Sequence, residues 1–202
     1  LKKIRQKIKI KISVDTYKYS VMHRALDCGV NIINDIFAMQ NDDRIPGLLS
    51  RYSAGISLMH MRGTPQTMQS DTSYEDVVLE VIQMLEASVK RAVDAGVDPA
   101  AIVVDPGIGF GKSVDANFEL LACASKIKTT LKKPLLIGIS NKSFIKKSTD
   151  GNSKSITAAM NALHGQLIMS GTDILRVHDI IDGVSVRDVY QKFIEAHSAG
   201  NT

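Results

Sequence analysis

The chain has 202 residues, of which 44% are apolar and 23% are charged, and this composition excludes a disordered or collagen-like protein. No run of 18 apolar residues is present, so no membrane-spanning helix is expected. The net charge of +4 suits an anionic small molecule, while the absence of tryptophan and an aromatic content of only 5% leave few rings for stacking on bases.

Six short apolar runs rich in β-branched residues predict buried strands. In chain order they span residues 10–14, 31–35, 56–60, 102–105, 135–139 and 173–177. Segments with helical spacing follow each of them. These predicted helices span residues 17–27, 43–54, 74–95, 117–131, 155–170 and 185–196. Pro46 suits the first turn of the second helix. Glycines are predicted to end four of the helices, at Gly29, Gly55, Gly96 and Gly171.

This strict alternation of strands and helices predicts a parallel sheet covered by helices. Two architectures fit it, a doubly wound open sheet and a (β/α)₈ TIM barrel. A nucleotide-binding open sheet would usually carry the pattern GxGxxG after its first strand, and none follows Val14. Since no repeat, low-complexity tract or linker interrupts the chain, we expect residues 1–202 to form a single domain.

Polar side chains follow every predicted strand, at the end where ligands bind in both architectures. The carboxylates of Asp15 and Asp105 and the amide of Asn34 suit a flat heterocycle, because a carboxylate accepts two hydrogen bonds from paired N–H groups. Cationic residues follow two other strands and suit a phosphate or diphosphate. They are Lys142, Arg176 and His178. His60 is predicted to be a buried, hydrogen-bonded histidine beneath the loop that follows it.

Six strings of the sequence resemble dihydropteroate synthases, in that family's order. They are ISVDTYK, IINDI, LMHMRGTPQTMQ, DPGIGFGK, GISNKSF and GTDILRVHD, between residues 12 and 179. The resemblance implies a TIM barrel that joins para-aminobenzoate to 6-hydroxymethyl-7,8-dihydropterin pyrophosphate in folate biosynthesis, releasing pyrophosphate. It also implies Mg²⁺ as a cofactor, a homodimer, and competition by sulfonamides with para-aminobenzoate in the complete enzyme.

The family's pterin-binding residues carry over to matching positions of this chain. Asn34 and Asp105 resemble the residues at the pterin edge, and Asp15 resembles the carboxylate at the inner end of the pterin pocket. Met59 resembles an apolar wall of that pocket, and Lys142 resembles the lysine between pterin and aminobenzoate. Asp15 and Lys142 are therefore expected to take part in catalysis as well as in binding.

The remaining roles concern the aminobenzoate and the leaving group. Ser143 resembles the residue near the aminobenzoate carboxylate, and Arg176 with His178 resembles the catalytic pyrophosphate clamp. Arg176 and His178 are separated by one residue, so on a strand they would share a face. The family usually has Ser-Arg-Lys where this chain has Asn141 in the middle position, which removes one cation from the rim.

The N-terminal region departs further from the family, which opens with two βα units before the string ISVDT. Their motifs, Asn-x-Thr-Pro-Asp-Ser-Phe and Gly-Glu-Ser-Thr-Arg-Pro, do not occur here. We therefore expect an N-terminally incomplete barrel of about six βα units, strands 3–8, with the metal-side asparagine in the missing part. No metal ligand is identified in this chain, and its activity on its own stays open.

Two alternative functions stay open at this point. One is a pterin-binding methyltransferase domain, which shares the barrel but needs no anion clamp. The other is a non-catalytic pterin-binding fragment. The basic N-terminus is not followed by an apolar signal core, and Cys28 and Cys123 have no metal or disulfide spacing. We therefore expect a cytoplasmic protein with no nucleic-acid or membrane partner.

Overall fold

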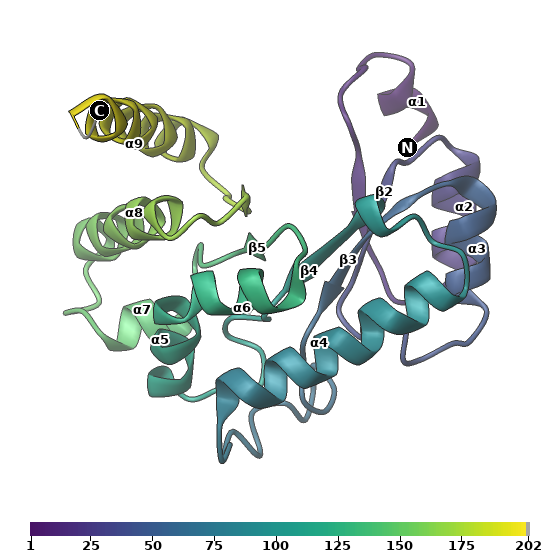
Figure 1. The fold of residues 1–202 in the computed structure, drawn as a ribbon, viewed down its shortest axis with the longest axis horizontal. Helices are drawn as coiled ribbons and strands as arrows, with labels where there is room; N and C mark the ends of the chain where they lie inside the picture. The colour runs from purple at the N-terminus through teal and green to yellow at the C-terminus, as the bar shows by residue number, and fades with distance from the viewer. Residues whose placement is uncertain (201–202) are drawn as a thin grey trace.

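The computed structural model describes residues 1–200 and arranges the strands of this segment as an open arc in chain order (Figure 1). Four strands form a parallel sheet: β1 (Ser13–Asp15), β2 (Ile32–Asp35), β3 (Gly55–Met59) and β4 (Ile102–Asp105). A second parallel pair consists of β5 (Leu136–Ile137) and β6 (Ile174–Leu175). One bridge between Val104 and Leu135 joins the two sheets, and within the described residues β6 does not pair with β1.

Helices lie along the outside of this arc. They are α1 (Lys2–Arg5), α2 (Tyr19–Asp27), α3 (Ile45–Tyr52), α4 (Val77–Asp94), the 3₁₀ turn η1 (Pro99–Ala101), α5 (Val114–Ala122), α6 (Ala124–Leu131), α7 (Ser143–Lys147), α8 (Ser153–Met169) and α9 (Ile180–Gly200). In Figure 1, α2 and α3 lie at one end of the arc, α4 to α6 along its middle, and α8 and α9 at the other end. No helix within residues 1–200 is long and apolar enough to cross a membrane.

The strand order decides between the two predicted architectures. A doubly wound sheet reverses its strand order at a switch point, whereas each strand here lies beside the strand that precedes it in the chain. This is the order of a (β/α) barrel that is open on one side. The prediction of a TIM barrel represented by about six βα units is confirmed.

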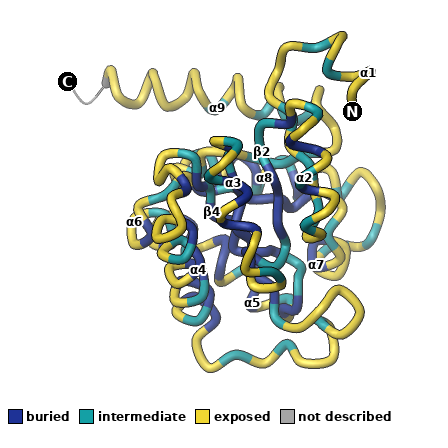
Figure 2. The backbone as a smooth tube through the Cα atoms, turned by 90° about the vertical axis from the view of Figure 1, so that its right-hand side faces the viewer, coloured by how far each residue is buried: buried dark blue, intermediate teal, exposed yellow. Residues whose placement is uncertain are grey.

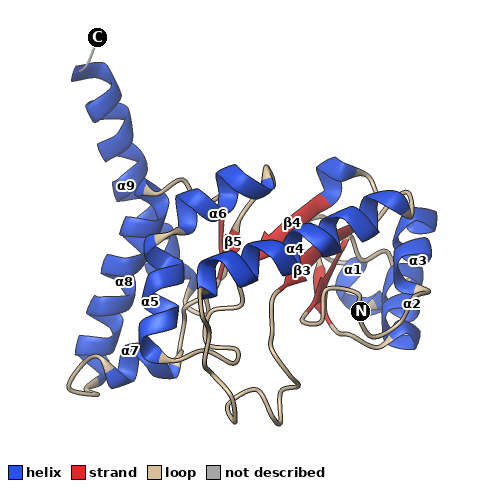
Figure 3. Cartoon of the chain, turned by 60° about the horizontal axis from the view of Figure 1, so that its bottom comes forward, coloured by secondary structure: helices blue, strands red, loops and turns tan. Residues whose placement is uncertain are grey.

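The hydrophobic core lies between the strands and the helices. Every second side chain of β2, β3 and β4 is fully buried there, namely Ile33, Ile56, Leu58, Ile102 and Val104. Helix α4, which crosses in front of β3 and β4 in Figure 3, begins where the Asp76 side chain accepts a hydrogen bond from Leu79 N (2.9 Å). Figure 2 shows the resulting buried centre, surrounded by exposed outer turns of the helices.

Several predicted boundaries differ in the structure. The single helix predicted over 117–131 is two helices that meet at Cys123, and the last two strands are shorter than predicted. Gly29, Gly96 and Gly171 have positive φ angles after helices, as predicted. Gly55 does not, because Ser53 adopts the left-handed conformation that ends α3. Gly55 instead begins β3, where a Cβ atom would lie 3.2 Å from the Ala101 carbonyl oxygen.

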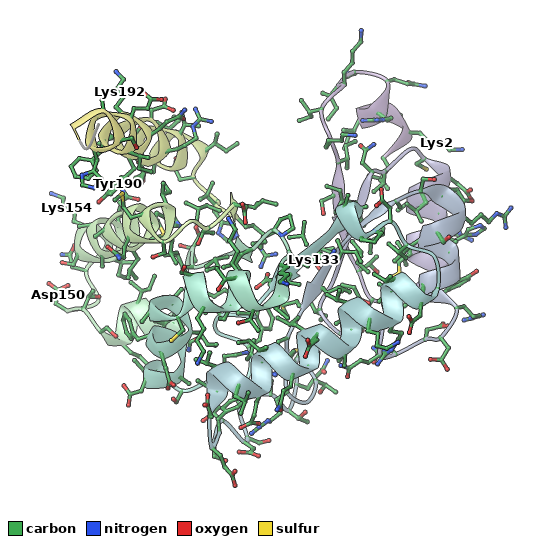
Figure 4. All side chains as sticks on the ribbon, viewed as in Figure 1. Lys2, Lys133, Asp150, Lys154, Tyr190 and Lys192 are labelled. Carbon is green, nitrogen blue, oxygen red and sulfur yellow. The ribbon has the colours of Figure 1, made fainter. Side chains whose placement is uncertain are left out.

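Helix α9 packs along α8 through a contact between Gly165 and Tyr190. A Cβ atom at position 165 would lie 2.1 Å from the Tyr190 ring, so the ring occupies the space that any larger residue would need. Figure 4 labels Tyr190 between the two helices. This contact places α9 at the end of the arc, next to β6.

His164 on α8 is buried without hydrogen-bond partners in the described structure for either ring nitrogen. Burial lowers the pKa of His164 below its usual value of 6.5. The unfolded chain therefore binds a proton near pH 6.5 that the folded chain does not, so stability falls as the pH drops below that value.

We predict that His164→Leu raises the free energy of unfolding by about 1 kcal/mol at pH 7.5 and by more at pH 5.5. Urea denaturation at both pH values measures this, and an equal or opposite change at the two values would contradict it.

Candidate functional site

The inner side of the arc contains a cavity of about 480 Å³, whose lining includes three predicted site residues, Asp15, Asn34 and Arg176. Parallel pairing places Asp15 beside Asn34, and Asn34 beside Ser57, on neighbouring strands. Met59 lies beside Asp105 in the same way and is fully buried. Because alternate residues of a strand share a face, the predicted pterin-edge residues project from the strand ends toward one region.

Arg176 joins this region across the arc. Its guanidinium donates hydrogen bonds to Asn34 Oδ1 (3.2 Å) and to Asp105 Oδ2 (3.0 Å). The side chain passes over Gly138, where a Cβ atom would lie 3.0 Å from two of the guanidinium nitrogens. The structure therefore connects three predicted site residues, which follow or end β2, β4 and β6.

The Asp105 carboxylate is held by neighbours on two sides. Gly107 N donates to its Oδ1 atom (2.8 Å), and Arg176 donates to the other oxygen. Burial raises the pKa of Asp105, while the charge of Arg176 and the Gly107 hydrogen bond oppose that rise. Arg176 thus supplies the nearest compensating charge for a carboxylate that is 1% exposed.

Lys142 lies beside this carboxylate, at the N-terminus of α7. Burial lowers the pKa of Lys142, and the charge of Asp105 acts against that shift. Its ammonium nitrogen lies 4.0 Å from the centre of the Phe110 ring, a cation–π contact. Phe110 is a site residue that the sequence interpretation missed, because a single aromatic residue in a glycine-rich loop gives no pattern. Its only signal was its place in the loop that follows Asp105.

Two buried polar groups support the loop after β4. His60 is 5% exposed and Lys112 is 4% exposed, and their Nδ1 and Nζ atoms are 3.1 Å apart. Burial is the main cause that lowers the pKa of His60 to about 3 and the pKa of Lys112 to about 7. The prediction that His60 is buried and hydrogen-bonded beneath the loop is confirmed. Lys112 was not predicted as a buried residue.

The loop between β3 and α4 braces the loop after β4. Gln69 Nε2 donates to the Gly109 carbonyl (3.2 Å), and the Tyr74 hydroxyl donates to the Gly111 carbonyl (2.9 Å). Arg62 lies over the Tyr74 ring, 3.9 Å from its centre, and forms an ion pair with Glu80. The two loops therefore form one connected rim at the ends of β3 and β4.

Three other predicted site residues have exposed side chains. Asp15 is exposed at the end of β1, and Ser143 is exposed at the start of α7. His178 is also exposed, and its Nδ1 atom lies 3.5 Å from Asn141 Nδ2. Since β6 ends at Leu175, the expected shared strand face of Arg176 and His178 is not formed. Their joint role in binding an anion stays a prediction.

The described residues do not form a metal site by themselves. No group of three or more His, Cys, Asp or Glu side chains within this part of the chain is placed to hold a metal ion. The residues present therefore do not fit a Mg²⁺ ion held by the protein alone, and no chemical step is assigned to one.

Parallel strands in chain order, with polar residues gathered at their carboxyl ends, define a ligand-binding (β/α) barrel. The chain belongs to the family of pterin binding enzymes, whose family profile matches residues 1–178. The site described above lies within that matched region.

Known relatives agree with this membership. The chain is 40% identical over 178 residues to the dihydropteroate synthase of Synechocystis, covering 88% of this chain and 61% of the relative. A Clostridium difficile dihydropteroate synthase solved with pteroic acid matches with a TM-score of 0.86 and 32% identity, covering 95% of this chain and 70% of that one. A Yersinia pestis dihydropteroate synthase in complex with a sulfonamide drug matches with a TM-score of 0.90 and 29% identity, covering 96% and 70%. The chain thus spans about three fifths of the length of its Synechocystis relative.

Proposed function

We propose that this chain forms the pterin-binding part of a dihydropteroate synthase, which joins para-aminobenzoate to dihydropterin pyrophosphate and releases pyrophosphate. The observation that carries the proposal is the group formed by Asn34, Asp105 and Arg176 at the strand ends. The dihydropteroate synthases among its relatives support the same choice of substrate.

The proposed reaction is a substitution at the exocyclic methylene carbon of the pterin. The bond from that carbon to the diphosphate oxygen breaks, and the diphosphate keeps the electron pair. The aminobenzoate nitrogen forms the new bond and releases a proton to solvent, and a neutral aniline needs no strong base for this step. Asp15 and Asp105 stabilise positive charge on the pterin, and Arg176 with His178 stabilises the leaving anion.

Around the aminobenzoate, we assign Lys142 to the space between the two substrates and Ser143 to the aminobenzoate carboxylate. The cation–π contact with Phe110 holds the Lys142 ammonium at the ring of the loop after β4. Sulfonamides are proposed to compete there in the whole protein, since a relative was solved with such a drug. Mg²⁺ accompanying the diphosphate, a homodimer and a cytoplasmic location are further proposals that rest on the sequence resemblance.

The proposed pterin contact predicts a loss of affinity in Asp105→Asn. An amide offers one acceptor oxygen and no charge, so one charge-assisted hydrogen bond to the pterin is lost. Such a bond contributes about 1.5–3 kcal/mol, equivalent to roughly 10- to 100-fold weaker binding. Calorimetric titration with dihydropterin pyrophosphate and Mg²⁺ at pH 7.5 measures the dissociation constant.

The matched control for this substitution is Asp94→Asn. Asp94 is an exposed residue of α4 whose carboxylate contacts Lys90, at the end of the helix that precedes β4. It should bind the pterin as the unmodified chain does. Unchanged affinity in a folded Asp105→Asn variant would refute the pterin-edge role of Asp105.

A further inference from the structure

Lys112 is a buried lysine that the proposed mechanism does not use. Its side chain is 4% exposed, and its ammonium nitrogen lies 2.9 Å from the carbonyl oxygens of Gly107 and Phe110. It also lies 3.1 Å from His60 Nδ1 and 3.5 Å from the His60 carbonyl oxygen. A lysine placed in this way is a structural part of the loop and not a surface charge.

The number of N–H donors on protonated Lys112 matches the number of acceptor atoms around its Nζ atom. Burial lowers the pKa of Lys112 to about 7. Below that pH the side chain is an ammonium group with three N–H donors, and three acceptors lie within 3.1 Å: two loop carbonyls and the His60 ring nitrogen. Above that pH the neutral amine keeps two N–H donors, which are enough for the two loop carbonyls. His60 is neutral at ordinary pH because burial lowers its pKa to about 3, so its Nδ1 atom accepts when the ring proton is on Nε2. The Lys112 side chain therefore ties the loop after β4 to the end of β3.

The tied loop holds two groups of the proposed site. Gly107 N donates to Asp105 Oδ1, and the Phe110 ring contacts the Lys142 ammonium. Between them, Gly109 N donates to Asn117 Oδ1 (2.6 Å), which anchors the outer part of the loop to α5. Lys112 is the inner anchor, and it bonds to the carbonyls of both residues that reach the site.

We propose that Lys112 is a positioning residue that sets the orientation of Asp105 and the place of Phe110 beside Lys142, through the carbonyls of Gly107 and Phe110. It acts without touching the substrate. This inference rests on the proposed function for its effect on pterin binding. Its effect on the loop does not require a ligand.

Lys112→Met separates hydrogen bonding from packing. Methionine is a similarly unbranched side chain that fills the same space without a donor. In the folded 202-residue variant, we expect amide exchange of residues 107–111 to accelerate at least tenfold, while residues 102–105 of β4 keep their protection. The nuclear Overhauser contact between the Phe110 ring and Lys142 Cε protons should be lost. Affinity for dihydropterin pyrophosphate should fall at least tenfold by calorimetry.

Two further variants complete the test. Lys147→Met, at an exposed position of α7, should match the unmodified chain in every measurement. Lys112→Arg keeps a cation with several donors, so it should recover part of the loop protection and part of the affinity that Lys112→Met loses. A role in packing alone would instead make Lys112→Met the better replacement.

The outcomes distinguish this inference from the proposed function. Unchanged loop exchange and unchanged Phe110–Lys142 contact in Lys112→Met would overturn it, as would equal defects in the Met and Arg variants. If Lys112→Met does not fold, Lys112→Gln, which keeps two donors, must still show faster loop exchange. A chain that binds no pterin would refute the proposed function, and the exchange measurement would then still decide the role of Lys112.

Discussion

Replacing Gly107 by alanine is expected to remove detectable pterin binding, a loss of more than about 100-fold, and to lower the free energy of unfolding by about 3 kcal/mol. Gly107 has a φ angle of +69°, and a Cβ atom there would lie 1.8 Å from the His60 carbonyl oxygen. This neighbour cannot easily move, because His60 N donates to the Asp105 carbonyl (3.0 Å) beside it. The loop must therefore leave its place, and Asp105 loses its hydrogen bond from Gly107 N.

Gly47→Ala is the matched control for this substitution. Gly47 lies in α3, its φ angle is not positive, and a Cβ atom added there would have no neighbour within 4 Å. Alanine in a helix is more stable than glycine by about 0.5–1 kcal/mol, so this variant should gain stability and keep its affinity. Urea denaturation and calorimetry on both variants are the measurements. A Gly107→Ala chain with normal affinity would show that the loop position is not needed for binding.

Arg176→Ala is expected to weaken binding of dihydropterin pyrophosphate by about 100-fold and to destabilise the fold by about 2 kcal/mol at pH 8. Removing one partner of a buried ion pair typically has a larger effect, about 3–5 kcal/mol. The smaller value is expected here because the Arg176 side chain is 40% exposed and is screened by solvent. Calorimetry and urea denaturation measure the two effects.

The loss of stability in this variant should depend on pH. Burial already raises the pKa of Asp105, and Arg176 opposes that rise, so without Arg176 the folded-state pKa moves further above the unfolded value. The folded chain then binds the proton more tightly, and its stability falls as the pH rises from about 4 through that pKa. The destabilisation should therefore be larger at pH 8 than at pH 4.5.

A double variant isolates the cause. Adding Asp105→Asn to Arg176→Ala removes the unpaired carboxylate, so at pH 8 the double variant should be more stable than Arg176→Ala alone. It should also lose the part of the pH dependence that arises from the Asp105 carboxyl group. A double variant that is less stable at both pH values would show that Arg176 acts through packing over Gly138 and not through its charge.

The α/β class could be predicted from the sequence because its signals are local, but these signals left two architectures open, and the barrel was predicted from the family resemblance. Short buried strands and the glycines after helices follow from the order of residues in one segment, and the alternation of strands and helices leaves few arrangements. The split at Cys123 was missed because the segment 117–131 keeps one helical spacing through the break. The prediction for Gly55 was wrong because Ser53, a residue that rarely adopts the left-handed conformation, ends α3 in its place.

The site was predicted only in part, because local sequence shows which residues end a strand but not which distant residues contact them. Strand-end position brought Asn34 and Asp105 to one edge, but it did not predict that Arg176 binds both of them. That contact depends on Gly138, which leaves room for the guanidinium. Lys112 gave no sequence signal for burial, because lysine in a loop is ordinarily exposed. Only the folded loop, with its carbonyls turned inward, gives this lysine partners.

The open arc also has a consequence for which parts of the structure depend on one another. Each strand of the four-stranded sheet pairs with the strand that precedes it in the chain, so these pairings join neighbouring segments of the sequence. The bond from Arg176 to Asn34 joins residues 142 positions apart. It requires β6 to lie beside β5, whereas the pairings of the four-stranded sheet involve neither of these strands. Most of the sheet therefore does not depend on the C-terminal strands, but the Arg176 contacts of the candidate site do.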